Sequence, residues 1–155
     1  KANSYLEIGS YLGATSVAAL DGNKLNAYFV DMWEQPIQTA RDDLKELPPN
    51  SKETFIFNVK KYKGKNTINI FDCNMFQVDT SELKNINVFF YDGPHDFDSI
   101  SKEVNFFNDR TQSGAIYVFD DISNYNHSLL EEDLLLTSVW SIFETSIRKI
   151  SYKKI

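Results

Sequence analysis

Five apolar runs of strand length recur along the chain, and each ends at or near a carboxylate. They cover residues 4–8, 26–31, 67–72, 86–92 and 115–121. Apolar residues follow one another almost continuously in these runs instead of alternating with polar ones, which is typical of strands buried on both faces. Four of the five runs end in aspartate, and the first carries Glu7 near its end. We therefore predict a sheet of buried strands with acidic residues at the strand ends.

Segments of helical length separate and follow these runs. We predict helices over residues 13–20, 35–47, 52–63, 96–110 and 128–149. Pro48 and Pro49 stop the second of them, because proline cannot continue a helix. The third is ambiguous, since its β-branched and aromatic residues favour a strand, but its place between two strands favours a crossover helix. Residues 149–155 predict one further strand.

Strands that alternate with helices indicate a single α/β domain over residues 1–155. We expect a doubly wound, mainly parallel, Rossmann-like sheet with helices on both faces. Ligands of such sheets bind beyond the carboxyl ends of the strands. Six acidic residues are predicted at that edge: Glu7, Asp31, Asp72, Asp92, Asp120 and Asp121.

Composition narrows the classes of protein that the chain can represent. The net charge of −6 argues against a protein that binds duplex nucleic acid, which needs a basic face. Cys73 is the only cysteine, so no internal disulfide forms, and a reducing, cytoplasmic setting is expected. No apolar run approaches the roughly 20 residues that span a bilayer. Exposed aromatic side chains would support a homodimer, although no segment locates an interface.

The stretch SYLEIGSYLGAT, residues 4–15, predicts a strand that turns tightly into a helix. Gly9 and Gly13 allow that turn and a close approach of the backbone to a ligand. Tyr11 occupies a position where a dinucleotide fingerprint has glycine, and Glu7 would repel a phosphate but suits an ammonium group. Asp31, at the end of the second run, suits the two hydroxyls of a ribose. An ordinary strand-turn-helix stays open, but the set favours a nucleoside with a cationic amino-acid portion over NAD.

The segments LEIGSYLGATS, FVDMW, VFFYDGPHDFDSI and GAIYVFDDIS occur in this order between residues 4 and about 123. In this the chain resembles class I S-adenosylmethionine-dependent methyltransferases. It is most similar to the small-molecule O-methyltransferase branch with a DG-x-H motif, which includes cephalosporin-hydroxylase-like and macrocin-type enzymes. The resemblance implies an enzyme that transfers a methyl group from S-adenosylmethionine to a small molecule.

The resemblance also implies a cofactor site. Its residues would be Glu7, Gly9, Ser10 and Gly13 at the methionine-side turn, Asp31 at the ribose, Met32 and Trp33 beside the adenine, and Asp72, Cys73 and Asn74 at the adenine edge. The helix that precedes the first strand in this family, and the last strands of its seven-stranded sheet, are expected to be missing. Substrate contacts are therefore not assigned.

Carboxylates at the ends of two adjacent predicted strands suggest a site for a hard cation. Asp92, Asp120 and Asp121 offer oxygen ligands, and in metal-dependent members of the family the matching positions hold magnesium. His95, three residues after Asp92, could then take the proton of a substrate hydroxyl. Turn formation by the two later aspartates, and a structural hydrogen bond for His95, are the alternatives.

Two other function classes stay open. The first is a degenerate, non-catalytic domain that binds a nucleoside, which the missing elements would favour. The second is a nicotinamide-dependent oxidoreductase, although Tyr11 in the turn and the lack of a Tyr-x-x-x-Lys pair count against it. Cys73 is interpreted as a packing residue, because no basic partner for a thiolate is evident.

Overall fold

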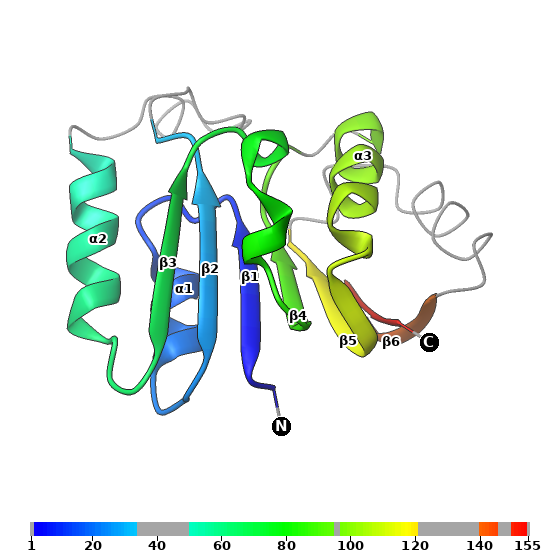
Figure 1. Cartoon of the computed structure of the whole chain (residues 1–155), viewed down its shortest axis with the longest axis horizontal. Coiled ribbons are helices and arrows are strands. Elements are labelled where there is room, and N and C mark those ends of the chain that lie inside the picture. The colour runs from blue at the N-terminus through cyan, green and yellow to red at the C-terminus, as the bar shows by residue number, and fades with distance from the viewer. Residues whose placement is uncertain (1, 34–49, 95–96, 121–139, 146–149, 155) are drawn as a thin grey trace.

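The computed structural model describes residues 2–33, 50–94, 97–120, 140–145 and 150–154. These residues form a seven-stranded sheet with the order β3-β2-β1-β4-β5-β7-β6 (Figure 1). The strands are β1 Ser4–Ile8, β2 Asn26–Asp31, β3 Thr67–Asp72, β4 Ile86–Tyr91, β5 Thr111–Phe119, β6 Trp140–Thr145 and β7 Ile150–Lys154. The first five strands pair in parallel, whereas β7 runs antiparallel to both β5 and β6. This arrangement confirms the predicted open α/β sheet.

Two expectations about the end of the chain are wrong. The predicted helix over residues 128–149 contains a strand at Trp140–Thr145, and the sheet has its last two strands instead of lacking them. Alternating apolar and polar residues at positions 140–142 suit a strand, but only pairing with β7 selects it over a helix. The rest of that predicted helix, and the predicted helix at 35–47, lie outside the described residues.

The described helices are α1 Ala14–Leu20, α2 Ser51–Lys61 and α3 Phe97–Asn108, with two short 3-10 helices, η2 Met75–Gln77 and η3 Thr80–Glu82. Segment α2 is the one whose sequence is ambiguous, and the crossover-helix interpretation is confirmed. Its buried residues Ser51, Phe55 and Val59 recur every fourth position and form one stripe along the helix. Among the described residues, no helix is long and apolar enough to cross a membrane.

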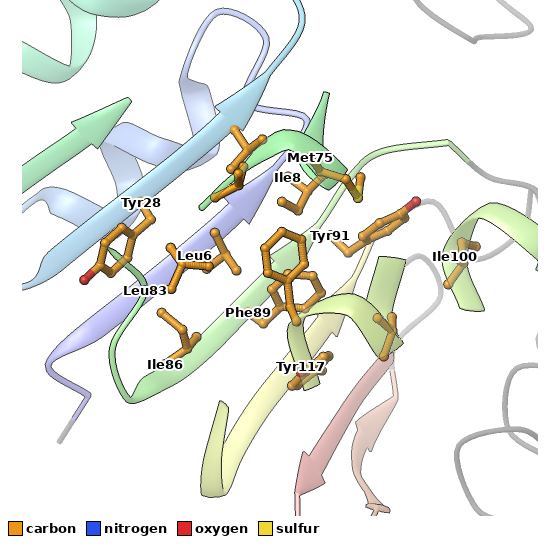
Figure 2. Close-up of a cluster of buried hydrophobic side chains, with 14 of the residues drawn as sticks. Leu6, Ile8, Tyr28, Met75, Leu83, Ile86, Phe89, Tyr91, Ile100 and Tyr117 are labelled. Carbon is orange, nitrogen blue, oxygen red and sulfur yellow. The ribbon is translucent and has the colours of Figure 1, made fainter. Parts of the chain in front are cut away.

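Successive residues of each parallel strand face opposite sides of the sheet, and both sides are covered. Leu6, Tyr28 and Phe89 belong to a cluster that also contains Ile100, Val104 and Phe107 of α3 (Figure 2). Their strand neighbours Tyr5, Phe29 and Phe90 pack instead with Leu20 of α1 and with Phe55 and Val59 of α2. Figure 1 shows α1 behind the sheet and α3 in front of it. Burial on both faces explains the continuous apolar runs in the sequence.

Candidate cofactor site and methyltransferase family

The carboxyl ends of the parallel strands meet at one edge of the sheet. Backbone hydrogen bonds continue the ladder one residue beyond the strands, from Asp92 N to Ile8 O (2.9 Å) and from Asp120 N to Tyr91 O (3.0 Å). On the other side of β1, Asp31 is the register partner of Asp72. The four aspartates predicted for this edge and described in the structure therefore lie at it.

The turn between β1 and α1, residues 9–13, depends on its glycines for packing. Gly9 has a φ of +81°, and a Cβ atom there would lie 2.6 Å from the carbonyl carbon of Asp92. Gly13 has a φ of +85°, and its Cβ would lie 2.9 Å from Cδ2 of Phe55. The turn can therefore lie close to the end of β4 at Gly9 and close to α2 at Gly13. The sequence motif by itself does not reveal this packing requirement for glycine.

Asp31 holds the turn from the end of β2. Its Oδ2 accepts the backbone N–H of Tyr11 at 2.7 Å. Burial raises the pKa of the Asp31 carboxyl above its ordinary value, while hydrogen bonds from the N–H groups of Tyr11, Met32 and Ser10 oppose that rise. A carboxylate with several N–H donors is fixed in position, which is what recognition of a ribose diol requires.

Glu7 lies beneath the turn and is almost fully buried, with 1% of its surface exposed. Its carboxyl oxygens accept the Tyr5 hydroxyl at 2.8 Å and the Ser16 hydroxyl at 2.9 Å. Burial raises the pKa of Glu7 to about 8, and the charges of Asp92 and Asp31 add to the rise. The structure therefore gives Glu7 a supporting role between β1 and α1.

Met32 and Trp33, the two residues that follow β2, differ in how far they are buried. Trp33 is buried in the core cluster beside α2, and its ring N–H donates to the Tyr11 carbonyl at 2.7 Å. Met32 is 38% exposed. Trp33 thus supports the turn from within the core, whereas Met32 is accessible to a ligand. An adenine contact by either residue stays a prediction.

Residues 72–74 continue the edge beyond β3. Asp72 forms an ion pair with Lys52 of α2. Cys73 is partly buried against the core, and burial, together with the charge of Asp72, raises the pKa of its thiol above the ordinary value. Asn74 caps η2 by accepting the backbone N–H of Phe76 at 3.0 Å. The packing role predicted for Cys73 is confirmed.

The predicted metal site is described only in part. Asp92 and Asp120 follow the adjacent strands β4 and β5 and are both partly buried, whereas His95 and Asp121 lie outside the described residues. Within the described part of the chain, no three His, Cys, Asp or Glu side chains are grouped as metal ligands. The three-aspartate site and the base role of His95 therefore stay predictions.

Several supporting residues were not anticipated from the sequence. Tyr5 lies two positions before Glu7 on the same side of β1, a spacing from which their contact could have been inferred. Asn58 of α2 donates its side-chain N–H to the Leu12 carbonyl at 2.9 Å. Nothing in the local sequence marks Asn58, because the contact joins residues that are 46 positions apart.

The residues at this edge fit S-adenosylmethionine. Asp31 presents fixed carboxyl oxygens suited to ribose hydroxyls. Ser10, which is only 3% exposed, has a hydroxyl with no hydrogen-bond partner among the described residues. An unpartnered buried hydroxyl in a native fold calls for a partner, and a ligand of the turn would supply one.

Comparison with known proteins identifies the family of the chain. Residues 6–122 match the family model described as a methyltransferase domain. No curated protein sequence matches the chain.

The fold is similar to those of solved methyltransferases. The O-methyltransferase NovP has a TM-score of 0.74 and 11% identity, covering 99% of this chain and 72% of NovP. The methyltransferase PaMTH1 of Podospora anserina, solved with bound SAH, has a TM-score of 0.67 and 12% identity, with 99% and 72% covered. The N-methyltransferase NodS of Bradyrhizobium japonicum, also with SAH, has a TM-score of 0.62 and 13% identity, with 99% and 78% covered. With the family match over most of its length, the chain belongs to the methyltransferase-domain family and is a class I S-adenosylmethionine-dependent methyltransferase.

Proposed function

We propose that this enzyme methylates an oxygen atom of a small molecule with the help of a divalent cation such as Mg²⁺. The observation that carries the proposal is the juxtaposition of Asp92 and Asp120 at the edge that also holds Asp31. The similarity to NovP, an O-methyltransferase, supports oxygen as the acceptor atom. S-adenosylmethionine, when bound, supplies the activated methyl group on its sulfonium.

In this proposal the cofactor is held by the residues that follow β1, β2 and β3. Asp31 binds the ribose hydroxyls, and Ser10 gives its buried hydroxyl a partner in the cofactor. Glu7, Gly9 and Gly13 shape the turn without needing to touch the cofactor themselves. The adenine lies near the exposed Met32. The segment formed by Asp72, Cys73 and Asn74 borders the adenine edge.

Acidic and basic side chains of the chain then bind and deprotonate the methyl acceptor. Asp92, Asp120 and Asp121 would hold the cation, which makes an acceptor hydroxyl more acidic. His95 would take the proton of the acceptor hydroxyl. The oxygen would gain the methyl group as the sulfonium–methyl bond of the cofactor breaks, which leaves S-adenosylhomocysteine. Since the attack needs only an in-line approach, positioning of the acceptor accounts for much of the rate.

We also propose a cytoplasmic setting and a homodimer. The free and partly buried thiol of Cys73 suits a reducing compartment. Phe57 of α2 is 68% exposed, and Phe76 of η2 is 47% exposed, so both offer apolar surface to a second copy. Analytical sedimentation of the purified chain measures directly whether it forms a dimer.

Calorimetric titration with S-adenosylhomocysteine in the presence of Mg²⁺ tests the function, with NAD as the alternative ligand. Asp31→Ala should weaken binding by about tenfold or more, because a charged hydrogen-bond acceptor for the ribose is lost. Asp92→Ala should remove methyl transfer while leaving cofactor binding much less affected. Asp21→Ala, an exposed aspartate at the end of α1, is the control with the same change of charge.

The outcomes separate the competing functions. Equal loss of cofactor binding in the Asp31 and Asp92 variants would contradict the separate roles proposed here. Binding of S-adenosylhomocysteine without transfer to any acceptor would favour a non-catalytic nucleoside-binding domain. Binding of NAD alone would favour an oxidoreductase.

A further inference from the structure

The β1–α1 turn is held at three consecutive residues by groups from outside it. The Tyr11 carbonyl accepts the ring N–H of Trp33 at 2.7 Å. The Leu12 carbonyl accepts the side-chain N–H of Asn58 at 2.9 Å. Gly13 lies so close to Phe55 that a Cβ atom would come within 2.9 Å of the ring. Two of these holding residues, Asn58 and Phe55, belong to α2.

The holding groups are themselves anchored in the core. Trp33 is 4% exposed and Phe55 is fully buried, and their ring centroids lie 4.9 Å apart. A buried indole N–H needs an acceptor, and the Tyr11 carbonyl is the one it has. The packing of Trp33 on α2 thus fixes both the position and the direction of this hydrogen bond.

The backbone of Tyr11 is bound on both sides. Its N–H donates to Asp31 at 2.7 Å, while its carbonyl accepts from Trp33 at 2.7 Å. Tyr11 also has a φ of +46°, in the left-handed region that a bulky residue rarely adopts. A residue in that conformation persists only when its surroundings hold it there.

We propose that Trp33 and Asn58 are positioning residues for S-adenosylmethionine, with α2 as the platform that fixes the turn before the cofactor arrives. A turn that is already ordered loses little conformational entropy on binding, which strengthens affinity without any contact to the ligand. This inference rests on the proposed placement of the cofactor at the β1–α1 turn. It adds residues that touch the turn from its far side.

Two substitutions separate these hydrogen bonds from the packing around them. Trp33→Phe keeps an aromatic ring in the core but removes the N–H, and Asn58→Ala removes the bond to Leu12. Each should weaken S-adenosylhomocysteine binding by about threefold to tenfold, the range expected for one hydrogen bond. Thr54→Ala, at an exposed position of the same helix, is the matched control and should bind as the unaltered chain does.

Hydrogen exchange of the free protein supplies a readout that general destabilisation does not produce. In both variants the amides of the turn should exchange faster while those of β4 keep their protection, and S-adenosylhomocysteine should slow the turn again. Circular dichroism checks that each variant is folded. If Trp33→Phe does not fold, Asn58→Ala carries the same test alone.

The results distinguish this inference from the function on which it rests. Weaker binding with faster exchange confined to the turn supports the inference. Unchanged affinity in both variants, with binding lost in Asp31→Ala, would overturn the inference and leave the cofactor site in place. Absence of binding to the unaltered chain would overturn the proposed site and this inference together.

Discussion

Gly9 shows how one residue joins the first strand to the fourth. Its missing side chain lets the turn after β1 approach the backbone of Asp92, and its φ of +81° lies where other residues are strained. The same contact brings the start of the β1–α1 turn beside Asp92, one of the proposed metal ligands. The sequence predicts a ligand-binding role for Gly9, and the structure shows that the packing of two strand ends also requires glycine there.

Gly9→Ala should destabilise the fold by about 2–5 kcal/mol, because it adds a steric overlap with backbone to the strain of a left-handed conformation. Gly114 of β5 is the control, since its φ is +83° and an added Cβ there meets nothing within 4 Å. Gly114→Ala should therefore cost only about 1–2 kcal/mol. Urea unfolding of both variants measures the difference, and equal losses would refute the role given to the Asp92 contact.

At the scale of elements, α2 links the core to the β1–α1 turn. Its buried stripe packs on the sheet, while Lys52, near its start, pairs with Asp72 at the carboxyl edge. That ion pair is partly exposed, so it contributes little to stability. The apolar contacts of Phe55 with Phe29 and Trp33 are the larger contribution.

Phe55→Ala should destabilise the protein by about 3–5 kcal/mol, the cost of a cavity left by a fully buried ring. Phe57→Ala, two residues away on the same helix, removes a ring that is 68% exposed and, at a concentration where the chain is monomeric, should change stability by at most about 0.5 kcal/mol. Thermal unfolding of the two variants compares them directly. Similar losses in both would mean that α2 does not pack as described.

At the scale of the whole molecule, assembly of the sheet brings together carboxylates that are distant in sequence. Asp31 and Asp92 come from different strand ends, and both act on the buried Glu7. Burial and the negative charges of these two aspartates favour the protonated form of Glu7.

Glu7 should make folding stability depend on pH. Its folded pKa of about 8 lies above the ordinary value of 4.5, so between these values the folded chain keeps a proton that the unfolded chain has released. Stability is then highest at the acidic end of this range and falls as the pH rises through it. The pKa of Asp31 is raised as well and acts in the same direction.

Glu7→Gln tests this dependence, because the amide is neutral at every pH. Its oxygen can still accept from one of the Tyr5 and Ser16 hydroxyls, while its N–H group can donate to the other. Urea unfolding across the same pH range should give a clearly flatter profile for this variant. The remaining slope should decrease further in Glu7→Gln combined with Asp31→Asn. A slope unchanged by either substitution would show that Glu7 is ionised in the folded protein.

The sequence by itself determined the five parallel strands and the edge at which the site lies. β1, β2 and β3 begin and end where the apolar runs do, because each run supplies the apolar residues that pack in the sheet and a charged or turn residue lies at its end. Asp31, Asp72 and Asp92 mark the carboxyl edge for the same reason. The strand bounds and the acidic strand ends depend on neighbouring residues only, so they can be predicted from the sequence.

The tertiary structure decided what local sequence leaves open. Residues 140–145 form a strand because β7 provides a pairing edge, which no nearby residue encodes. Gly13 faces Phe55, Trp33 turns inward to Tyr11, and Asn58 reaches Leu12, all contacts between segments far apart in the chain. Such contacts depend on how helices and strands pack, and packing is a property of the assembled fold rather than of any one segment.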